Sequence, residues 1–221
     1  MAKSWHKYYK DHHGVIWSNI LLHWYYLALI ALGFPKKVLE IGCGPADHSV
    51  FLSSVLPGIN ISVLDFDKKI IASLRKYDKK KIDKFYICDI TDPKMVKKLG
   101  FKNQEFDVIY SQGLLEHFSK DDSQKIINLF LPYTKRLIFS IPSEKYPNRD
   151  YGNELLRSKK ELGDIFKEIQ NITFKIKGYF PDVGLRTKIM TINKGKLSFL
   201  EKINFLLFGS CHYFIEIKRT S

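Results

Sequence analysis

Cysteine is scarce in this chain of 221 residues, which holds three, at positions 43, 88 and 211. Their wide separation matches none of the closely spaced pairs that bind zinc, and it offers no disulfide framework. The first residues, MAKSWHKYYKDHH, lack the apolar core of a secretory signal. We therefore expect a protein of a reducing compartment, the cytoplasm, without a zinc site.

Two nucleotide-binding signatures are also missing. The P-loop pattern G-x-x-x-x-G-K-[ST] does not occur, which excludes that kind of phosphate site. The chain has a close glycine pair, Gly42 and Gly44, in the stretch VLEIGCGPADHS. Asp47 stands where the dinucleotide fingerprint G-x-G-x-x-G needs its third glycine. The glycines nevertheless indicate a turn in which backbone passes close to a ligand.

Acidic residues are outnumbered, because 36 Lys and Arg face 23 Asp and Glu and the net charge is +13. One interpretation is a polyanionic partner, either RNA or an acidic membrane surface. The other is a lysine-rich composition whose charges only face solvent. The lysine runs at 68, 79 and 97 are dispersed and carry no interleaved aromatics, which favours the second interpretation.

Residues 14–34, GVIWSNILLHWYYLALIALGF, contain no charged side chain. A bilayer-spanning helix needs ~20 apolar residues, so the length is sufficient. Ser18, Asn19 and His23 interrupt the run, however, and Gly33 to Pro35 end it directly before the first expected strand. We expect residues 1–35 to form a helical cover of the active site, with peripheral membrane contact as the alternative.

From Lys36 onward, short apolar stretches alternate with helix-like ones. Strands are expected at 36–41, 60–66, 84–90, 106–111, 136–141, 172–180 and 211–220, and helices at 46–56, 68–78 and 158–169. This alternation predicts an α/β domain over 36–221: a doubly wound, mostly parallel seven-stranded sheet with helices on both faces. Residues 181–209 are too long for a bare loop and are expected to form a helical cap before the last strand.

Carboxylates follow three of the first four expected strands. They are Glu40, Asp65 and Asp89, and ligands of such sheets bind at the carboxyl ends of the strands. Carboxylates repel phosphate but accept hydrogen bonds from ribose hydroxyls and amino groups. Asp65 follows Gly42 by 23 positions, near the ~20 expected of a ribose-binding acid. The pattern indicates a nucleoside ligand that also carries a cationic, amine-containing part.

Taken in order, these strand ends resemble the S-adenosylmethionine-dependent methyltransferases of class I, the Rossmann-like kind. VLEIGCGPA is similar to the family's first motif, VLDFD to its ribose-binding acid and CDITD to its adenine-contacting motif. FDVIYSQGLLEHF, residues 106–118, resembles the L-E-H block of small-molecule members. The resemblance spans about residues 36–141 and implies an enzyme that uses S-adenosylmethionine and releases S-adenosylhomocysteine.

The resemblance implies a role for the backbone around two strand ends. Glu40 and the glycine turn would hold the methionine part of the cofactor, and the segment after the fourth strand would run beneath it. Ala46 departs from the family's frequent third glycine, where a small residue suffices. The residues implied for this half of the cofactor are Glu40, Gly42, Cys43, Gly44, Ser111, Gln112 and Gly113.

For the nucleoside half, the resemblance implies that Asp65 takes the ribose hydroxyls and Asp89 accepts from the adenine amino group. Phe66 and Ile90 would form the two walls against the adenine ring. Each acid also precedes a helix, so helix N-capping is the alternative for either one alone. Both acids in register favour cofactor binding.

The sequence LLEHF offers a catalytic pair, Glu116 and His117. A histidine beside the methyl donor suits a general base with a pKa near 7. The alternative is that the pair only orders its loop, because methyl transfer depends chiefly on positioning and needs no catalytic residue. Some relatives complete a metal site with an acid three residues before the pair. Gly113 occupies that position here, which disfavours a metal.

Elements outside the core are expected to shape the site of the methyl acceptor. They are the cap at 181–209, the loop at 140–154 and the aromatic N-terminal stretch. Packing of a covering helix is the simpler interpretation for most of these aromatics. The candidates are Trp5, Tyr8, Tyr9, His12, His13, Trp17, Tyr146, Arg149, Tyr151 and Glu154.

Three functions remain open from the sequence. The leading hypothesis is a methyltransferase acting on an oxygen or nitrogen of a small-molecule or lipid-like acceptor. The second keeps the chemistry but makes the acceptor RNA, although SQGL lacks the N/D-P-P-Y/F motif of amino-directed nucleic-acid enzymes. The third is a cofactor-binding partner subunit without turnover. The sequence predicts no oligomeric state.

Overall fold

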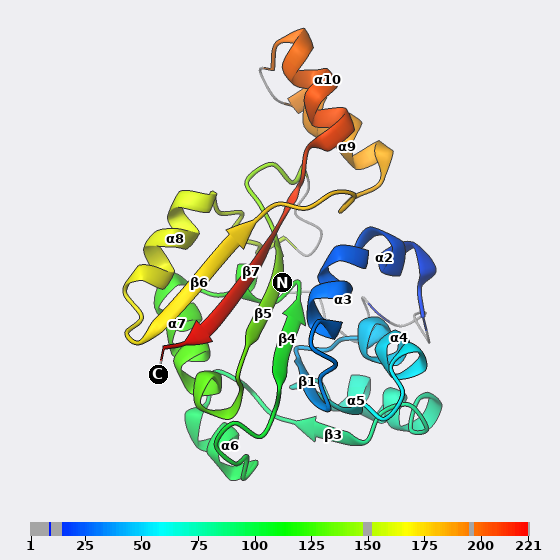
Figure 1. Ribbon diagram of the computed structural model, residues 1–221, viewed down its shortest axis with the longest axis vertical. Coiled ribbons are helices and arrows are strands. Elements are labelled where there is room, and N and C mark those ends of the chain that lie inside the picture. The colour runs from blue at the N-terminus through cyan, green and yellow to red at the C-terminus, as the bar shows by residue number, and fades with distance from the viewer. Residues whose placement is uncertain (1–8, 10–14, 148–151, 195–196, 221) are drawn as a thin grey trace.

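A computed structural model of the chain describes residues 9, 15–147, 152–194 and 197–220 (Figure 1). Within them, one seven-stranded sheet has the order β3-β2-β1-β4-β5-β7-β6. All neighbouring strands pair in parallel except β7, which is antiparallel to β5 and β6. The strands are β1 (Lys37–Ile41), β2 (Asn60–Asp65), β3 (Lys84–Ile87), β4 (Val108–Gln112), β5 (Leu137–Pro142), β6 (Ile172–Lys177) and β7 (His212–Arg219). The predicted α/β, mostly parallel sheet is confirmed.

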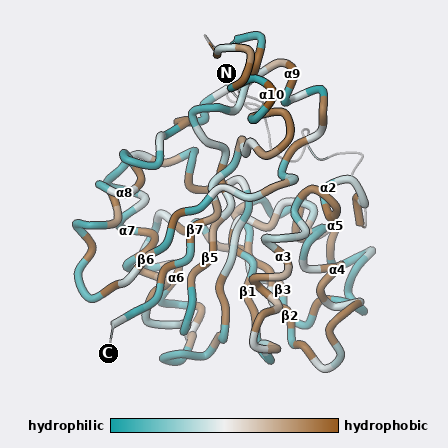
Figure 2. Tube along the Cα trace, turned by 45° about the horizontal axis from the view of Figure 1, so that its top comes forward, coloured by the Kyte–Doolittle hydropathy of each residue, from teal (hydrophilic) through white to brown (hydrophobic). Residues whose placement is uncertain are grey.

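Helices cover both faces of this sheet (Figure 1). They are α2 (Trp17–Leu22), α3 (Trp24–Ala31), α4 (Asp47–Val55), α5 (Lys68–Tyr77), α6 (Pro93–Lys98), α7 (Lys120–Phe130), α8 (Lys159–Lys167), α9 (Leu185–Lys194) and α10 (Phe199–Phe208), with 3₁₀ turns η1 (Leu115–His117) and η2 (Leu131–Tyr133). One hydrophobic core lies between the sheet and α6, α7 and α8. A second lies between the sheet and α2 to α5. Figure 2 shows the hydrophobic strands enclosed between helices whose outer sides are hydrophilic.

The charge-free segment forms two helices rather than one. α2 ends at Leu22 and α3 begins at Trp24, with His23 between them in a non-helical conformation. The side chain of His23 turns inward and lies 3.0 Å from His48 Nε2. Within the described residues, no helix is long and apolar enough to cross a membrane.

The region expected to be a cap is a helical hairpin, in which α9 and α10 pack on each other. It projects beyond the carboxyl ends of the central strands at the top of Figure 1. Ser198 begins α10 with a capping box: its hydroxyl oxygen accepts from Glu201 N, and the Glu201 carboxylate accepts from Ser198 N. The acceptor candidates Trp5, Tyr8, His12, His13, Arg149 and Tyr151 lie outside the described residues.

Arg136, at the start of β5, fastens the N-terminal helices to the sheet. Its guanidinium donates to the carbonyl oxygens of Leu29 and Leu32 at the end of α3, at 2.9 and 3.0 Å. Its Nε donates to Glu216 on β7 at 2.9 Å. The last carbonyls of a helix have no partner within the helix, so this side chain satisfies two of them while its charge is paired.

We therefore expect Arg136→Ala to lower the free energy of unfolding by about 1–3 kcal/mol, because two carbonyls lose their donor and Glu216 keeps only Lys218, 3.4 Å away. Arg136→Lys should recover only part of this loss, since an ammonium cannot reproduce the planar fork. The matched control is Arg75→Ala, which removes one exposed bond to Phe85 O and should cost under ~0.5 kcal/mol. Urea unfolding measures all three, and equal losses for both alanine variants would contradict this role.

Candidate active site

The loop that follows β1 alternates into left-handed backbone. Gly42, Gly44 and Ala46 have φ angles of +61°, +49° and +56°. A Cβ on Gly42 would lie 2.6 Å from Leu114 Cδ1, and one on Gly44 would lie 3.1 Å from Tyr9 Cε2. Glycine is therefore needed at the first two positions for both conformation and space. Ala46 takes the third left-handed position with its Cβ fully buried, so the loop keeps its shape without the family's frequent third glycine.

A cavity of about 310 Å³ opens beside this loop, at the carboxyl ends of β1, β2, β3 and β4. It brings together eight of the residues predicted for the site, from strand ends far apart in the sequence. They are Gly42, Gly44, Asp65, Phe66, Asp89, Ile90, Gly113 and His117. We call this the first cavity. Tyr9, Leu64, Ile70, Leu114 and Asn153 are among the other residues lining it.

Asp65 is fixed by backbone at the end of β2. Its two carboxylate oxygens accept from Gly44 N at 3.0 Å and from Asp67 N at 2.9 Å. Burial raises the pKa of Asp65, and these two hydrogen bonds lower it again. A carboxylate offers about four lone-pair positions. Asp65 therefore keeps acceptor capacity for a hydroxyl group in the first cavity.

Helix capping does not explain Asp65 or Asp89. The N-cap of α5 is Asp67, whose side chain accepts from Lys69 N. The N-cap of α6 is Asp92, which accepts from Lys94 N and Met95 N. Asp89 instead accepts hydrogen bonds from the backbone N–H and the hydroxyl of Thr91. β3 ends at Ile87, three residues before the predicted limit. Both predicted acids line the first cavity.

A second cavity, of about 710 Å³, shares Gly42 and Tyr9 with the first. It extends away from Asp65 and Asp89, between α2 on one side and the segment leading into α9 on the other. Among the described residues that line it, none is Lys or Arg. Its polar lining is Ser18, Asn19, His23, Glu40, Asp47, His48, Gln112, Asp182, Thr187 and His212, with Tyr9 and Tyr146 adding aromatic hydroxyls.

Glu40 lies on the wall of the second cavity but is tied to the protein. Its Oε2 accepts from Ser49 Oγ at 2.6 Å and from Tyr110 hydroxyl at 3.5 Å, and His48 Nδ1 lies 3.9 Å from its Oε1. Burial raises the pKa of Glu40 to about 8, against the lowering effect of the Ser49 hydrogen bond. The carboxyl is therefore held largely protonated at neutral pH.

Three histidines converge on the second cavity. His23 Nδ1 lies 3.0 Å from His48 Nε2, and the rings of His23 and His212 are 6.0 Å apart. Burial lowers the pKa of His48 to about 4, and burial with the neighbouring His48 and His212 lowers that of His23. These two imidazoles are neutral at pH 7 and offer lone pairs. No group of three His, Cys, Asp or Glu in the described part of the chain is arranged to hold a metal ion.

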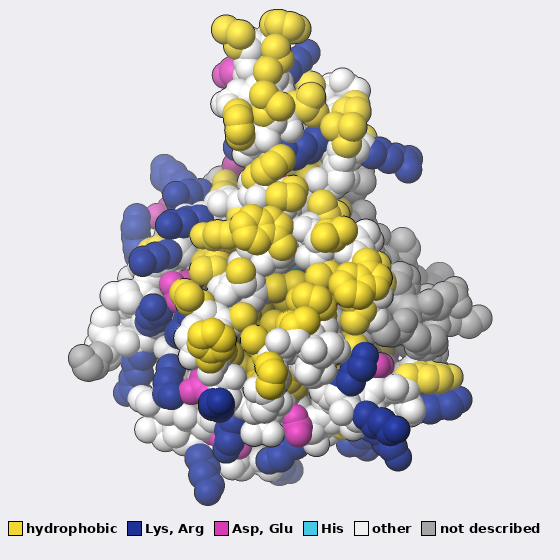
Figure 3. All heavy atoms as spheres, turned by 45° about the vertical axis from the view of Figure 1, so that its right-hand side comes forward, with side chains coloured by type: hydrophobic (Ala, Val, Ile, Leu, Met, Phe, Trp, Pro, Cys, Tyr) yellow, Lys and Arg dark blue, Asp and Glu magenta, His cyan; other side chains and the backbone are white. Residues whose placement is uncertain are grey.

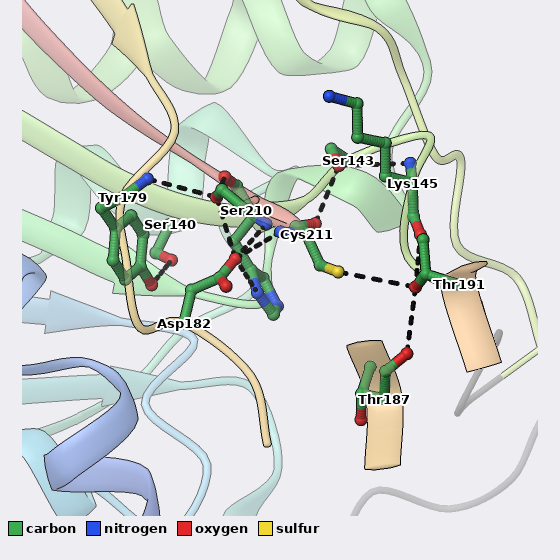
Figure 4. Close-up of polar contacts among 10 residues, drawn as sticks. Ser140, Ser143, Lys145, Tyr179, Asp182, Thr187, Thr191, Ser210 and Cys211 are labelled. Carbon is green, nitrogen blue, oxygen red and sulfur yellow. Dashed lines mark hydrogen bonds and ion pairs between the residues drawn. The ribbon is translucent and has the colours of Figure 1, made fainter. Parts of the chain in front are cut away.

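Asp182 anchors the start of the cap to the start of β7 (Figure 4). Its Oδ2 accepts from Ser210 Oγ at 2.9 Å and from the backbone N–H groups of Cys211 and His212 at 2.5 and 2.6 Å. The same oxygen is 3.4 Å from His212 Nδ1. Asp182 Oδ1 and His212 Nδ1 are buried, and neither makes a hydrogen bond within the described structure. The second cavity is thus lined by an imidazole beside a carboxylate, and each has one polar atom without a hydrogen bond in the described structure.

The end of β4 is held from outside by the N-terminal helices. The hydroxyl of Tyr26, on α3, donates to Ser111 O at 2.6 Å, and both residues are fully buried. Ser111 lines neither cavity, whereas the next two residues do: Gln112 faces the second and Gly113 the first. Cys43 also faces the second cavity. The predicted methionine-binding backbone therefore lies where the two cavities join.

The predicted catalytic pair lies away from the second cavity. His117 lines the first cavity, where its Nδ1 is 2.7 Å from Asn153 Oδ1, and burial lowers its pKa. Glu116 lines neither cavity and is 3% exposed. Its backbone carbonyl accepts from Leu155 N, and burial raises the pKa of its side chain to about 8. This environment suits a residue that orders the loop between β4 and α7.

The sequence reasoning missed four residues of the second cavity: His23, His48, Asp182 and His212. Each comes from a different segment, and none belongs to a motif with fixed spacing. His23 appeared only as an interruption of an apolar run, and Asp182 only within the expected cap. Of the acceptor candidates, Tyr9 and Tyr146 line the second cavity, whereas Trp17 is 65% exposed and Glu154 binds the backbone of Gly152.

Comparison with known proteins agrees with this geometry. Residues 38–135 match a family model described as a methyltransferase domain. This stretch runs from β1 to the turn before β5 and includes every strand end of the first cavity. A comparison with curated protein sequences gives no significant match.

Solved structures share the architecture at low sequence identity. A SAM-dependent methyltransferase from Archaeoglobus fulgidus has a TM-score of 0.63 at 16% identity, over 90% of this chain and 93% of that one. The plantazolicin methyltransferase BpumL, in complex with SAH, has a TM-score of 0.60 at 15% identity, over 92% and 84%. The small RNA methyltransferase HEN1 has a TM-score of 0.63 at 15% identity, over 92% of this chain and 25% of that one. Residues 38–135 are thus similar to a methyltransferase domain, and the chain shares the Rossmann-like fold of these solved methyltransferase structures.

Proposed function

We propose that the protein transfers a methyl group from S-adenosylmethionine to an oxygen or nitrogen atom of a small-molecule or lipid-like acceptor. The cofactor would occupy the first cavity and the Gly42 junction, and the acceptor would occupy the second cavity. The observation that carries the proposal is the shared wall: Gly42 and Tyr9 line both cavities, so the reactive end of a ligand in one faces the other.

The first cavity suits the nucleoside half of S-adenosylmethionine. Asp65 has acceptor capacity left for the ribose hydroxyls, and Asp89 for an amino group. Phe66, 56% exposed, and Ile90 offer apolar surface for a base. The left-handed backbone of Gly42 and Gly44 would pass beside the tail of the cofactor. Glu40, Cys43 and the backbone of Gln112 and Gly113 would surround the methionine group.

The lining of the second cavity selects the class of acceptor. Three carboxyl side chains and three imidazoles face it, and none of its described lining residues is cationic. Such a wall offers no cation to a phosphate group and accepts hydrogen bonds from amines and hydroxyls. The site therefore favours a neutral or cationic acceptor with an amine or hydroxyl group over one recognised through phosphates.

When bound, S-adenosylmethionine supplies a methyl group on a positively charged sulfur. The chain's task is to hold the acceptor atom in line with that methyl group and to receive the acceptor's proton. His212 is placed to receive it, because Asp182 beside Nδ1 would stabilise the resulting imidazolium. The acceptor's lone pair would form the new bond to carbon, and the electron pair of the broken carbon–sulfur bond would stay on sulfur. The roles first predicted for His117 and Glu116 remain predictions.

RNA is the second candidate acceptor, favoured by the net charge of +13 and by the likeness to the small RNA methyltransferase HEN1. Its phosphates would bind outside both cavities, on the lysine-rich surface. Binding of a short RNA should then fall steeply with added salt, because counterions are released. If the acceptor is instead a small molecule, as we propose, a gel-shift titration starting at low salt should detect no such RNA binding. A third candidate, a partner subunit without turnover, predicts cofactor binding without S-adenosylhomocysteine release.

Asp65→Ala should weaken binding of S-adenosylmethionine by about 10- to 100-fold, because charge-assisted hydrogen bonding to the ribose is lost. Calorimetry with both S-adenosylmethionine and S-adenosylhomocysteine measures the change. Asp92→Ala is the matched control, since it removes an equivalent carboxylate that caps α6 outside the first cavity. Unchanged affinity in the Asp65 variant would refute the site.

His212→Asn should lower kcat by about 100-fold or more while leaving the Kd for S-adenosylmethionine within about twofold, because only proton transfer is affected. His117→Asn is the comparison: under the proposal it weakens cofactor binding and leaves the rate at saturation. Release of S-adenosylhomocysteine is followed with a panel of small amines and alcohols. The reverse pattern, with kcat lost only in the His117 variant, would restore the sequence-based prediction and sink the role of His212.

Glu116→Gln should remove a pH dependence of stability. The pKa of Glu116 is raised to about 8 in the folded protein from 4.5, so its stabilising contribution is present at low pH and is lost as pH rises from about 4.5 to about 8. The amide does not titrate. The difference in free energy of unfolding between variant and wild type should therefore shift in favour of the variant across that window. Parallel pH profiles from urea unfolding would contradict the raised pKa.

A further inference from the structure

The outer face of α10 is apolar where a soluble helix is normally polar. Apart from Glu201 in its first turn, its exposed side chains fall in two adjacent rows at helical spacing, and in these rows Asn204 is the polar exception. The apolar members are Phe199, Leu200, Ile203, Leu207 and Phe208, of which Phe199 and Leu200 are 75% and 76% exposed. The inward side of α10 already packs against the rest of the protein, because Phe205 forms a buried cluster with Val183 and Cys211. The exposed rows are therefore not needed for the fold.

Further exposed apolar side chains lie on the neighbouring elements. Leu185 and Ile189 are exposed on α9, and Trp17, Leu21 and Trp24 on α2 and α3. Figure 3 shows hydrophobic side chains in a column from the tip of α10 down toward the N-terminal helices, with Lys and Arg at its margins. We call the exposed apolar side chains of α10, α9, α2 and α3 named above the apolar face. Contiguous exposed patches of this kind mark interaction sites.

The charge beside the apolar face is strongly positive. Among the described residues of 185–208, the accessible cations are Arg186, Lys194 and Lys202, against the single acid Glu201, and the whole chain carries +13. Two copies of this chain meeting on the apolar face would bring like charges together. An anionic lipid surface complements the same charges, at ~1 kcal/mol for each Lys or Arg near it.

The dimensions of α10 determine the mode of contact. Its 10 residues span about 15 Å, half of the ~30 Å of a hydrocarbon core. It cannot cross a bilayer, but it can lie in the interface with its apolar rows among the acyl chains. Trp17 and Trp24 are of the type that favours the headgroup level.

We propose that the protein docks on an anionic lipid surface through the apolar face, with α10 lying in the plane of the membrane. The second cavity is lined from α2 by Ser18 and Asn19 and from the start of α9 by Thr187, so it opens between two parts of this face. An amphiphilic acceptor would then reach the cavity from the lipid, a consequence that rests on the proposed function.

Co-sedimentation with phosphatidylcholine vesicles, with and without phosphatidylserine, tests the docking. The wild-type chain should bind the anionic vesicles, and binding should weaken as salt is added. Phe199→Ser combined with Leu200→Ser should lower the partition coefficient by about tenfold or more. Lys202→Glu should lower it by about fivefold or more on anionic vesicles only.

Two control variants lie on α6, at the opposite end of the molecule. Met95→Ser and Lys97→Glu remove an exposed apolar side chain and an exposed cation there, and both should bind vesicles as the wild type does. Equal losses in the control and α10 variants, no binding by the wild type, or self-association that the α10 variants abolish would each overturn the proposal. Calorimetry with S-adenosylmethionine is run without vesicles on the same variants, so failure of the docking and failure of the cofactor site are read separately.

Discussion

Parallel pairing of β1 with both β2 and β4 is the constraint on which both cavities depend. Glu40 is in register with Val63 on one side and with Tyr110 on the other, so three strands end at the same level. At that level the chain leaves β1 through left-handed backbone and β4 through Gly113, which is also left-handed. The loops diverge to opposite faces of the sheet, and the space between them is divided at Gly42 into a nucleoside-sized part and a larger polar part.

The part of the site that could be predicted is formed by residues that are close together in the sequence. Apolar strands followed at once by Asp65 or Asp89 can be read without knowing the fold, because the strand and its polar end are adjacent in the chain. Which acids cap helices was settled only by geometry: Asp67 and Asp92 take that task, two and three residues beyond the acids in question. The hydrogen bonds that fix such turns depend on φ and ψ values that composition does not reveal.

The second cavity could not be read from the sequence, because its polar groups meet only through tertiary packing. His23 and His48 lie 25 residues apart, and Asp182 reaches the start of β7 across 29 residues. The burial that keeps His23 and His48 neutral is equally non-local. The net charge is misleading for a similar reason, since the lysines lie outside while the described walls of both cavities hold carboxyl groups and no Lys or Arg.

The bonds of Arg136 have a consequence for the order of events during synthesis. They join α3 to β5 across 104 and 107 residues, and the ion pair to Glu216 lies a further 80 residues along the chain. The aromatic helices α2 and α3 leave the ribosome before the strands of the sheet. They can pack on β1 and α4 early, but Arg136 can reach their carbonyl end only after the start of β5 has been made, and its ion pair to Glu216 forms only with β7. Until β5 has been made, this end of the helix pair is held by apolar contact alone and is open to contact with other chains.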